Sequence, residues 1–311
     1  MGLTVYIPCF NVENYIESSI RGLLSQTRPP DEILVIDDGS TDRSLEIASR
    51  FPVRVIRHER NRGLAAARNT AFANASHELV GAIDADVFPE ADWLERLLAH
   101  FDDESVAGAG GRLIEQFRDT PADMWRFLHL CQDMGEKRID IEWPSPRRLG
   151  GFGTILRKSA VADVGGYNES FRTNYEDVDL CERLLRAGHK LVFEPLAVAH
   201  HQRRDDVRSI VRADWRSEFY THYYHGGYNN IWLKLFFNFR WARVLVWEHI
   251  RMGRPSLLAI DARLPWILSM MDLQYYFSPA RLPHFEAAPN LSAIYLPRPF
   301  RHFVKGGPIP S

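Results

Sequence analysis

Short apolar runs alternate with stretches of helical periodicity along the first part of the chain. Each run and the helix after it span about thirty residues or fewer, as a crossover between two parallel strands requires. The pattern therefore predicts an α/β fold with a mostly parallel, Rossmann-like sheet flanked by helices. Strands are expected at 3–7, 33–36, 53–56 and 79–83, and helices at 14–24 and 64–75.

The length of 311 residues is enough for one large hydrophobic core, or for one core with a small appendage. Hydrophobic residues at 45% and charged residues at 25% are typical of a globular protein and exclude a disordered or collagen-like chain. The net charge of −2 is unevenly spread, because the residues from Lys234 onward include ten Lys or Arg against four Asp or Glu. An acidic body and a basic tail with different roles are expected.

The three cysteines, Cys9, Cys131 and Cys181, are far apart and lack the spacing of a metal site. A reduced, cytoplasmic protein is the simplest interpretation. The N-terminus enters the first expected strand directly, without the basic and apolar regions of a signal peptide. No uncharged apolar run approaches the roughly 20 residues that cross a bilayer, so we do not expect the chain to span a membrane.

Two aspartates, Asp84 and Asp86, directly follow the expected strand 79–83. In open α/β sheets ligands bind outside the carboxyl ends of the strands, so a site is expected here. Carboxylates one residue apart are hard oxygen ligands suited to Mg²⁺ or Mn²⁺ that bridges phosphate oxygens. Taken alone, the pair is better explained as a solvated turn or a helix N-cap.

The expected strand 33–36 also ends in acidic residues. Ser40 or Asp42 would cap the helix that follows. That leaves Asp38 without a structural role, and a carboxylate at a sheet edge can accept the imide N–H of a uracil. Two acidic strand ends together favour a nucleotide site.

A third acidic cluster, Glu176, Asp177 and Asp179, opens a helix expected to run through Arg186 and to stop at Gly188. Acids in a first turn are stabilised by the helix dipole. Three acids nevertheless exceed what one cap requires, and one of them can serve as a general base.

The last expected strand, 191–193, is broken by Pro195 and followed by His200 and His201. A lone histidine is usually packed or solvated. A histidine beside a metal site is a candidate ligand.

The order of these motifs resembles that of the family 2 glycosyltransferases of the GT-A fold, over roughly residues 1–205. No single motif is decisive, and the specificity lies in their order. In chain order they are Ile7-Pro8-Cys9-Phe10-Asn11, Asp37-Asp38-Gly39-Ser40-Thr41-Asp42, Asn61-Arg62-Gly63 with Ala67-Arg68-Asn69, Asp84-Ala85-Asp86, Gly150-Gly151-Phe152-Gly153, Gly165-Gly166-Tyr167, Glu176-Asp177-Val178-Asp179-Leu180 and 195–200.

The resemblance implies a donor site for a nucleoside-diphosphate sugar, with a UDP-sugar favoured. The backbone around Pro8 and the ring of Phe10 would cradle and stack the nucleobase, and Asp38 would read its edge. The other residues assigned to the nucleotide-sugar site are Asn11, Asn61, Gly63, Arg68, Asp84, Ala85, Gly151 and Gly153.

The resemblance also implies a Mn²⁺ or Mg²⁺ ion and a catalytic base. Asp86 would coordinate the metal directly, Asp84 would lie by the ribose and the metal, and His200 rather than His201 would add a metal or diphosphate contact. Asp177 matches the family's base, and Glu176 would orient it or touch the acceptor. The implied reaction is a single displacement with inversion, which transfers the sugar to a hydroxyl of a saccharide or a lipid-linked saccharide.

Some features depart from the family pattern or stay ambiguous. Cys9 stands where relatives often carry a small polar residue, which affects only local packing. The residues 150–153 either let the backbone approach donor or acceptor, or form a plain turn. The sequence shows no Gln-x-x-Arg-Trp signature of processive polysaccharide synthases, which favours transfer of single sugars.

The expected organisation is a catalytic domain at 1–205, with a donor half to about 110 and an acceptor half at 111–205, and a mainly helical extension at 206–311. A helix packed over the acceptor side is slightly favoured for this extension, while an anionic membrane surface or a dimer contact stays open. The extension carries aromatic and basic residues together, including Trp232, Lys234, Phe236, Phe239, Arg240, Arg243, Trp247 and Arg251.

Two other functions remain as alternatives to a sugar transferase. A nucleotidyltransferase also combines an α/β sheet, a metal and a nucleotide, but the residues 8–11 occupy the place of its Gly-rich basic loop. A protein that binds sugar nucleotides without turnover would have no need of Asp86, Asp177 and His200. A nucleic-acid partner is not expected, because the body is acidic and shows no basic stripe.

Overall fold

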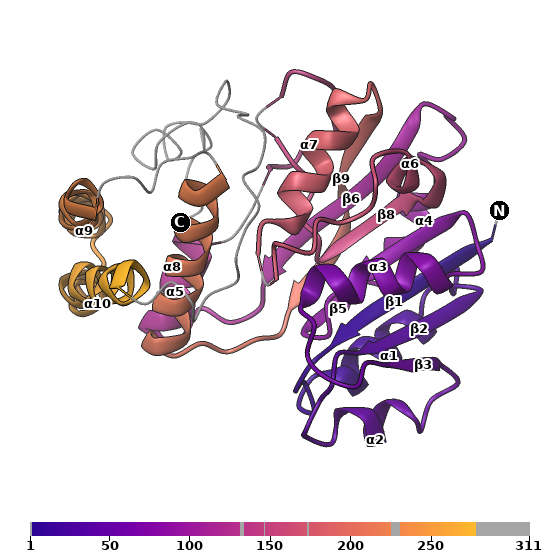
Figure 1. Cartoon of the computed structure of the whole chain (residues 1–311), viewed down its shortest axis with the longest axis horizontal. Coiled ribbons are helices and arrows are strands. Elements are labelled where there is room, and N and C mark those ends of the chain that lie inside the picture. Colours follow the sequence, from indigo (N-terminus) through magenta and orange to yellow (C-terminus); the bar gives the residue numbers. More distant parts are fainter. Residues whose placement is uncertain (1, 131–133, 146, 173, 225–230, 278–311) are drawn as a thin grey trace. The chain divides into compact units, whose positions relative to one another are not determined.

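The computed structural model describes residues 2–130, 134–145, 147–172, 174–224 and 231–277, with side chains omitted at 217–224, 274–275 and 277. The chain divides into two compact units, one of residues 1–116 and 132–203 and the other of residues 117–131 and 204–311 (Figure 1). The chain passes into the second unit for the second time between residues 203 and 204, close to the expected boundary at 205. The segment 117–131, which the sequence assigned to the acceptor half, groups with the C-terminal helices instead.

A mixed sheet forms the centre of the first unit. In the described part of that unit its strand order is β3-β2-β1-β4-β8-β6-β9-β5, with β7 beside β9. Strands β3, β2, β1 and β4 are parallel, whereas β8, β5 and β7 run antiparallel to their neighbours. The strands are β1 (Leu3–Cys9), β2 (Glu32–Asp37), β3 (Arg54–Arg57), β4 (Leu79–Ile83), β5 (Val87–Pro89), β6 (Val106–Glu115), β7 (Ile139–Ile141), β8 (Gly153–Arg157) and β9 (Lys190–His201).

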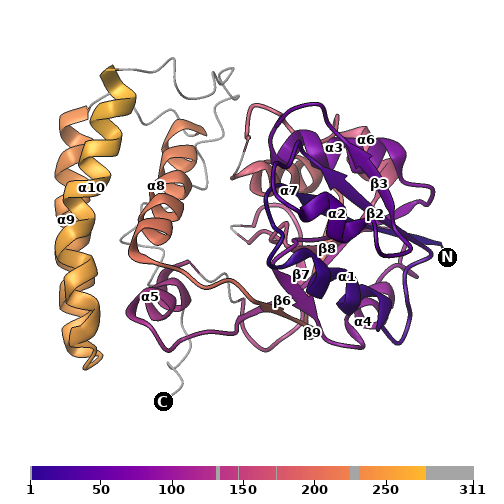
Figure 2. The ribbon, with the colours of Figure 1, turned by 90° about the horizontal axis from the view of Figure 1, so that it is seen from below.

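Helices cover both faces of this sheet (Figure 2). Alternate residues of β1 divide between the two sides: Val5 and Ile7 pack with one set of helices, and Tyr6 packs with the other. This alternation follows from the two-residue period of a strand. One face carries α1 (Ile16–Leu24), α2 (Ser44–Ala48) and α4 (Trp93–Leu98), and the other carries α3 (Leu64–Asn74), α6 (Lys158–Asp163) and α7 (Glu176–Arg186).

The elements expected from the sequence are present in this unit, with ends shifted by at most two residues except in β9, which extends beyond the expected 191–193 to His201. The sequence did not indicate β5 to β8, because their apolar runs are short or rich in glycine, as in β6. These strands complete the second half of the sheet. They matter for the site because β6 and β9 run in the same direction as β4. The carboxyl ends of these three strands therefore lie at the same edge of the sheet.

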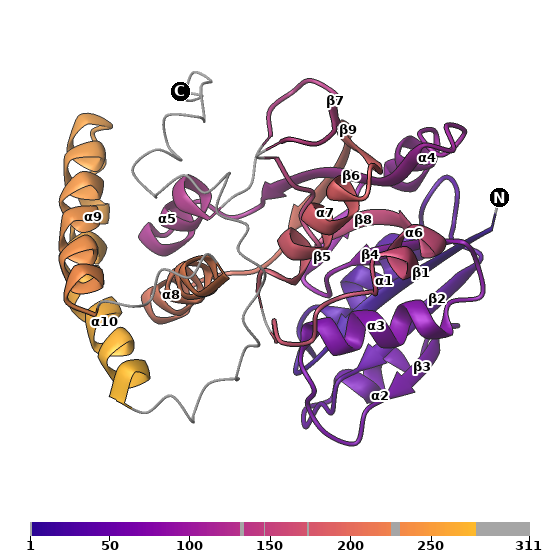
Figure 3. The ribbon, with the colours of Figure 1, turned by 45° about the horizontal axis from the view of Figure 1, so that its top comes forward.

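The second unit is helical in its described part. It contains α5 (Pro121–His129), α8 (Val207–Tyr224), α9 (Ile231–Arg251), the short 3₁₀ helix η1 (Pro255–Leu257) and α10 (Leu258–Phe277). Helix α5 begins at a proline, and the side chain of Thr120 accepts a hydrogen bond from the amide of Asp123. Helices α9 and α10 lie side by side (Figure 2), and α5 lies next to α8 (Figure 3). Among the described residues, no helix is both long and apolar enough to cross a membrane. Cys131 and the tail after 277 lie outside the described residues.

Strand β9 continues through Pro195, so the prediction that this proline ends the strand was wrong. In its register with β6, Gly111 lies opposite Glu194 and the next residue, Arg112, lies opposite Val198. The intervening residues of β9 form a bulge, where a proline removes no ladder hydrogen bond. The bulge lets one continuous strand carry the chain to the sheet edge at His201.

The bulge also explains why position 111 is glycine. A Cβ atom there would lie 2.2 Å from the carbonyl oxygen of Ala197 and 2.8 Å from Nε1 of Trp93. Both neighbours are buried, so neither can move without disturbing the core.

We expect Gly111→Ala to lower the free energy of unfolding by about 2–3 kcal/mol, because the added methyl group overpacks the bulge. Gly135→Ala is the control: no described atom lies within 4 Å of its added Cβ, so we expect only the backbone strain, about 1 kcal/mol, that its φ of +96° imposes on alanine. Urea unfolding of both variants measures the difference. Equal stability of the two variants would contradict the proposed packing.

Candidate active site

Six strands of the sheet, β3 among them, run in one direction and end at the same edge. The carboxyl ends of β1, β2 and β4 meet there because these strands are parallel, and β6 and β9 run in the same direction. The amide of Asp84 donates to the carbonyl oxygen of Phe152 at 3.1 Å, which ties the turn after β4 to the start of β8. The acidic residues singled out in the sequence therefore leave the sheet at one edge.

Arg68 on α3 is the buried centre of this region, with an exposed fraction of 1%. Its guanidinium group donates to the hydroxyl of Tyr6 at 3.1 Å and to the carbonyl oxygen of Gly151 at 2.9 Å. It also pairs with Glu176 Oε1 at 3.2 Å and with Asp84 Oδ1 at 3.4 Å. One side chain thus joins β1, β4, the segment before β8 and the first turn of α7.

The two carboxyl groups beside Arg68 have raised pKa values. Loss of solvent raises the pKa of Asp84 to about 6; Arg68 opposes this increase and the charge of Asp86 adds to it. Burial, followed by the charge of Asp177, raises the pKa of Glu176 to about 8 against the opposing effect of Arg68. Glu176 Oε2 is buried without a hydrogen-bond partner among the described residues, which costs less for a neutral carboxyl group than for a carboxylate.

Asp177 is held at the first turn of α7 by two backbone amides. Its Oδ2 accepts from the amide of Gly151 at 2.7 Å, and its Oδ1 accepts from the amide of Val178 at 2.8 Å. A Cβ atom at position 151 would lie 2.6 Å from Arg68 Nη2 and 3.2 Å from Asp177 Cβ. Gly151 therefore serves close packing of the site's own residues, while Asp177 remains partly exposed.

Asp86 forms a second charged group with His201 and Glu115. His201 Nε2 lies 3.2 Å from Asp86 Oδ2, and His201 Nδ1 lies 2.8 Å from Glu115 Oε2. Burial lowers the pKa of His201, but hydrogen bonds to Asp86 and Glu115 outweigh it and bring the pKa to about 9. Burial raises the pKa of Asp86, yet the hydrogen bond and charge of His201 leave it lowered overall. The imidazole is therefore a cation between two carboxylates.

The structure brings His201 to Asp86 and directs His200 elsewhere, contrary to the expectation for this pair. His200 Nε2 lies 2.9 Å from Glu90 Oε1. Adjacent residues of β9 point to opposite faces of the sheet, so only one of the two histidines can face Asp86. The sequence did not show that β9 continues through both histidines and directs them to opposite faces.

The donor set at this edge suits a divalent cation that is shared with a ligand. No group of three or more His, Cys, Asp or Glu side chains in the described ranges forms a preassembled metal site. Asp84 and Asp86 supply carboxylate oxygens next to each other, and Mg²⁺ or Mn²⁺ is often held by one or two carboxylates together with phosphate oxygens and water. The residues therefore fit a cation that arrives with a diphosphate.

Asp38 has a structural role that the sequence did not indicate. Its Oδ1 accepts from the amide of Arg62 at 2.8 Å and lies 2.6 Å from His58 Nδ1, and its Oδ2 accepts from the amide of Gly63 at 2.8 Å. Asp38 is 3% exposed. The carboxylate is largely occupied with holding the loop before α3, so the structure does not present it as a free reader of a base edge.

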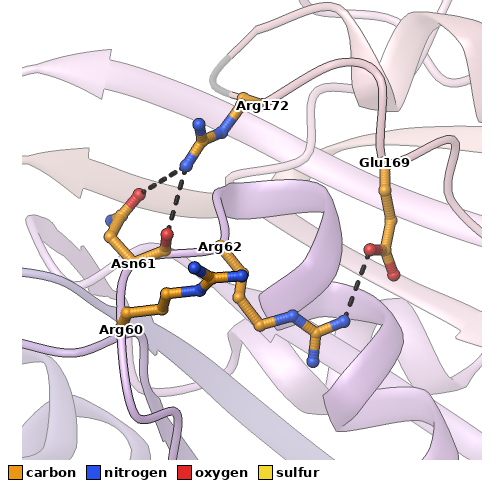
Figure 4. Close-up of a pocket in the computed structure, with 5 residues that line it drawn as sticks. All are labelled: Arg60, Asn61, Arg62, Glu169 and Arg172. Carbon is orange, nitrogen blue, oxygen red and sulfur yellow. Dashed lines mark hydrogen bonds and ion pairs between the residues drawn. The ribbon is translucent and has the colours of Figure 1, made fainter.

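The loop before α3 borders a polar pocket of about 410 Å³ (Figure 4). Arg172 Nη2 donates to the backbone oxygen and to Oδ1 of Asn61 at 3.1 and 3.2 Å. The amide of Leu64 donates to the carbonyl oxygen of Arg172, so α3 offers this amide to the chain itself rather than to a phosphate. The sequence analysis missed most of the lining, which is Arg60, Asn61, Arg62, Glu169 and Arg172.

The end of β1 places Phe10 and Asn11 at the same sheet edge. The ring of Phe10 is 45% exposed and is free to stack on a planar group. Asn11 adopts a φ of 54°, donates its amide to Ser40 Oγ at 3.1 Å and accepts from the amide of Thr41 at 2.9 Å. Asn11 therefore holds the turn after β2. Pro8 is partly buried beside it, Ala85 is buried, and the Cβ position of Gly153 faces Trp93.

Comparison with known proteins identifies the family. The sequence profile of Glycosyl transferase family 2 matches residues 4–165, more than half of the chain. The chain belongs to this family. Its fold is the GT-A fold of this family, as the order of its motifs predicted.

Two curated relatives illustrate the match. This glycosyltransferase is 33% identical over 276 residues to the pre-mycofactocin glycosyltransferase of Mycobacterium tuberculosis, covering 86% of this chain and 52% of the relative. It is 26% identical over 203 residues to the poly-beta-1,6-N-acetyl-D-glucosamine synthase of Staphylococcus aureus, covering 63% of this chain and 49% of that protein. The chain spans about half the length of the curated relatives it matches.

Two solved structures resemble the glycosyltransferase in fold. TarS 1–349 from S. aureus, in complex with UDP, has a TM-score of 0.56 at 20% identity and covers 89% of this chain and 92% of that one. A mannosyltransferase from Pyrobaculum calidifontis, in complex with GDP-Man and Mn²⁺, has a TM-score of 0.53 at 19% identity and covers 97% and 82%.

Arg68→Met should lower the free energy of unfolding by about 3 kcal/mol at pH 8, because it leaves the buried carboxyl groups of Glu176 and Asp84 without their cation. Urea unfolding measures the loss. Adding Glu176→Gln to this variant should recover part of it, since the amide carries no charge to bury. No recovery in the double variant would show that the loss comes from packing alone.

The loss should also depend on pH. The pKa of Glu176 is raised in the folded protein, so proton uptake stabilises the fold fully below its unfolded value of about 4.5, and this contribution disappears as pH rises toward 8. The deficit of Arg68→Met should therefore be smaller at pH 5 than at pH 8. An equal deficit at both values would contradict a charged Glu176 as its cause.

Proposed function

We propose that this glycosyltransferase moves a single sugar from a nucleoside-diphosphate sugar to a hydroxyl group of a saccharide or lipid-linked saccharide, with inversion at the anomeric carbon. A UDP-sugar is the favoured donor, and the synthesis of a cell-surface polysaccharide or glycolipid is the favoured context. The observation that carries this proposal is Asp177, a partly exposed carboxylate fixed by the amides of Gly151 and Val178 beside the Arg68 centre.

Asp177 is proposed as the general base. Its carboxylate accepts the proton of the acceptor hydroxyl while the acceptor oxygen forms a bond to the anomeric carbon. The bond from that carbon to the diphosphate oxygen breaks on the opposite face of the sugar, which inverts the configuration. Two backbone amides fix the direction of the carboxylate, so less orientational freedom is lost in the reaction.

Glu176 is proposed to orient the site rather than to take the proton. It is buried against Arg68, and its raised pKa of about 8 keeps it largely protonated at neutral pH. Arg68 in turn holds the backbone carbonyl of Gly151, whose amide positions Asp177.

Donor binding is proposed at the edge formed by Phe10, Asp84 and Asp86. A Mn²⁺ or Mg²⁺ ion held there by the two aspartates would stabilise the negative charge of the departing diphosphate. His201 is proposed to add a positive charge beside Asp86. The structural neighbours in complex with UDP and with GDP-Man and Mn²⁺ support a nucleoside-diphosphate donor without fixing the base.

The proposal is tested first by calorimetry with UDP, GDP and dTDP, each with and without Mn²⁺, followed by transfer assays with sugars of the nucleotide that binds. Asp177→Asn should reduce transfer by about 10³-fold and leave donor binding nearly unchanged, because the amide keeps the shape but cannot accept the proton. Normal turnover of this variant would exclude Asp177 as the base. Absence of binding by all three nucleotides would favour an inactive or partner-dependent protein.

The two histidines provide a matched pair for the diphosphate end of the site. His201→Ala should weaken Mn²⁺-dependent nucleotide binding by about tenfold, as Asp86→Ala should, because His201 orients Asp86. His200→Ala, which removes the adjacent side chain on the other face of β9, should leave the affinity close to that of the parent protein. Titration of each variant with Mn²⁺ present measures this. A larger loss for His200→Ala would restore the assignment expected from the sequence.

A further inference from the structure

Helices α9 and α10 expose large apolar side chains. On α9, Trp232 is 76% and Trp247 63% exposed, and Phe236, Phe239 and Ile250 lie on the same side at helical spacing. On α10, Trp266 is 65% and Met270 61% exposed. Single exposed apolar residues are ordinary, but a row along two helices indicates a surface that meets something apolar.

The opposite side of each helix buries polar groups. Asn238 is 3% exposed, and His249, Asp261 and Asp272 are fully buried. His249 Nδ1 lies 2.6 Å from Asp261 Oδ2, and Asn238 Nδ2 donates to Asp272 Oδ2 at 2.8 Å. These bonds fix the rotation of both helices. Turning the aromatic side inward would break both hydrogen bonds and separate the buried charged groups from their partners. The buried polar contacts therefore keep the apolar side of each helix exposed.

The exposed rows of the two helices join into one surface. The rings of Phe239 on α9 and Trp266 on α10 pack edge to face, with centroids 5.0 Å apart. Helices α9 and α10 also lie side by side in two views (Figures 1 and 2). We call this surface, formed by Trp232, Phe236, Phe239, Trp247, Ile250, Trp266 and Met270, the aromatic face.

The charges around the aromatic face are of one sign. In the described range 231–277 four of the five arginines are exposed and Arg254 is half-buried, whereas Asp261 and Asp272 are buried and Glu248 is half-buried. The exposed arginines are Arg240, Arg243, Arg251 and Arg263. Arg240 and Arg243 are interleaved with the aromatic residues on the outer side of α9. Arginine stems can lie along apolar surface while the guanidinium groups reach a polar layer.

We propose that the aromatic face binds the surface of an anionic lipid bilayer, with α9 and α10 lying in the interface rather than crossing it. Tryptophan and phenylalanine partition into the boundary between headgroups and acyl chains, and interleaved arginines are attracted to anionic headgroups. Within residues 231–277 neither helix meets the length and hydropathy of a membrane span. A typical protein interface does not need all its surrounding charges to be positive. Positive charges around an apolar face are what the headgroups of an anionic bilayer attract.

The test is flotation of the full chain with phosphatidylcholine vesicles and with vesicles containing about 30% phosphatidylglycerol. The protein should bind the anionic vesicles, and raised salt should weaken this binding. The triple variant Trp232→Ser, Trp247→Ser and Met270→Ser should bind about tenfold more weakly. Arg240→Glu with Arg243→Glu should remove the preference for the anionic lipid.

Matched controls distinguish this face from the rest of the surface. The variant Leu24→Ser with Leu196→Ser removes exposed apolar side chains of the first unit and should bind vesicles like the parent protein. Circular dichroism and nucleotide binding report whether each variant is folded, and neither readout depends on lipid.

Two results would overturn the proposal. The first is the absence of binding to anionic vesicles, or binding that the triple variant retains in full. The second is a parent protein that sediments as a dimer without lipid, while the triple variant sediments as a monomer. That result would assign the aromatic face to a second copy of the chain.

Discussion

The buried guanidinium group of Arg68 is the interaction on which the arrangement of the site depends. A buried cation is tolerated only where acceptors surround it, and here they come from four segments: Tyr6, Asp84, Gly151 and Glu176. Because Gly151 also holds Asp177, the position of the proposed base follows from the pairing of Arg68. The loss expected from its replacement therefore concerns the catalytic geometry as well as stability.

The sequence predicted those parts of the fold that periodicity and strand-end chemistry encode. The first four strands and the helices between them appear as expected because each carries its own local pattern. Asp84, Asp86 and Asp177 could be proposed as site residues because acids at strand and helix ends occur in a recognisable order, and their roles stay predictions. Strand β9 was cut short because Pro195 is a reliable strand breaker only where no bulge accommodates it, and that bulge depends on Gly111 of a distant strand.

The remaining differences between the sequence analysis and the structure concern which neighbours a side chain contacts. The sequence analysis gave Asp38 no structural role, but in the folded protein the amides of Arg62 and Gly63 donate to its carboxylate oxygens. The choice between His200 and His201 depends on the pleat of β9, and no local pattern contains that information. The pocket residue Arg172 lies more than a hundred positions from Asn61 along the chain, so only the folded structure joins them.

The charges at the sheet edge argue for a link between donor and metal binding. Among the described residues there, Asp84, Asp86, Asp177 and Glu115 are acidic side chains, and burial raises the pKa of Glu176 to about 8. Arg68 and His201 offset only part of this negative charge. If the proposed donor binds here, a nucleoside diphosphate would bring further negative charge to the same edge, and repulsion would oppose its binding. A divalent cation held by Asp84 and Asp86 would offset that repulsion, so nucleotide affinity and metal affinity should each increase when the other ligand is present.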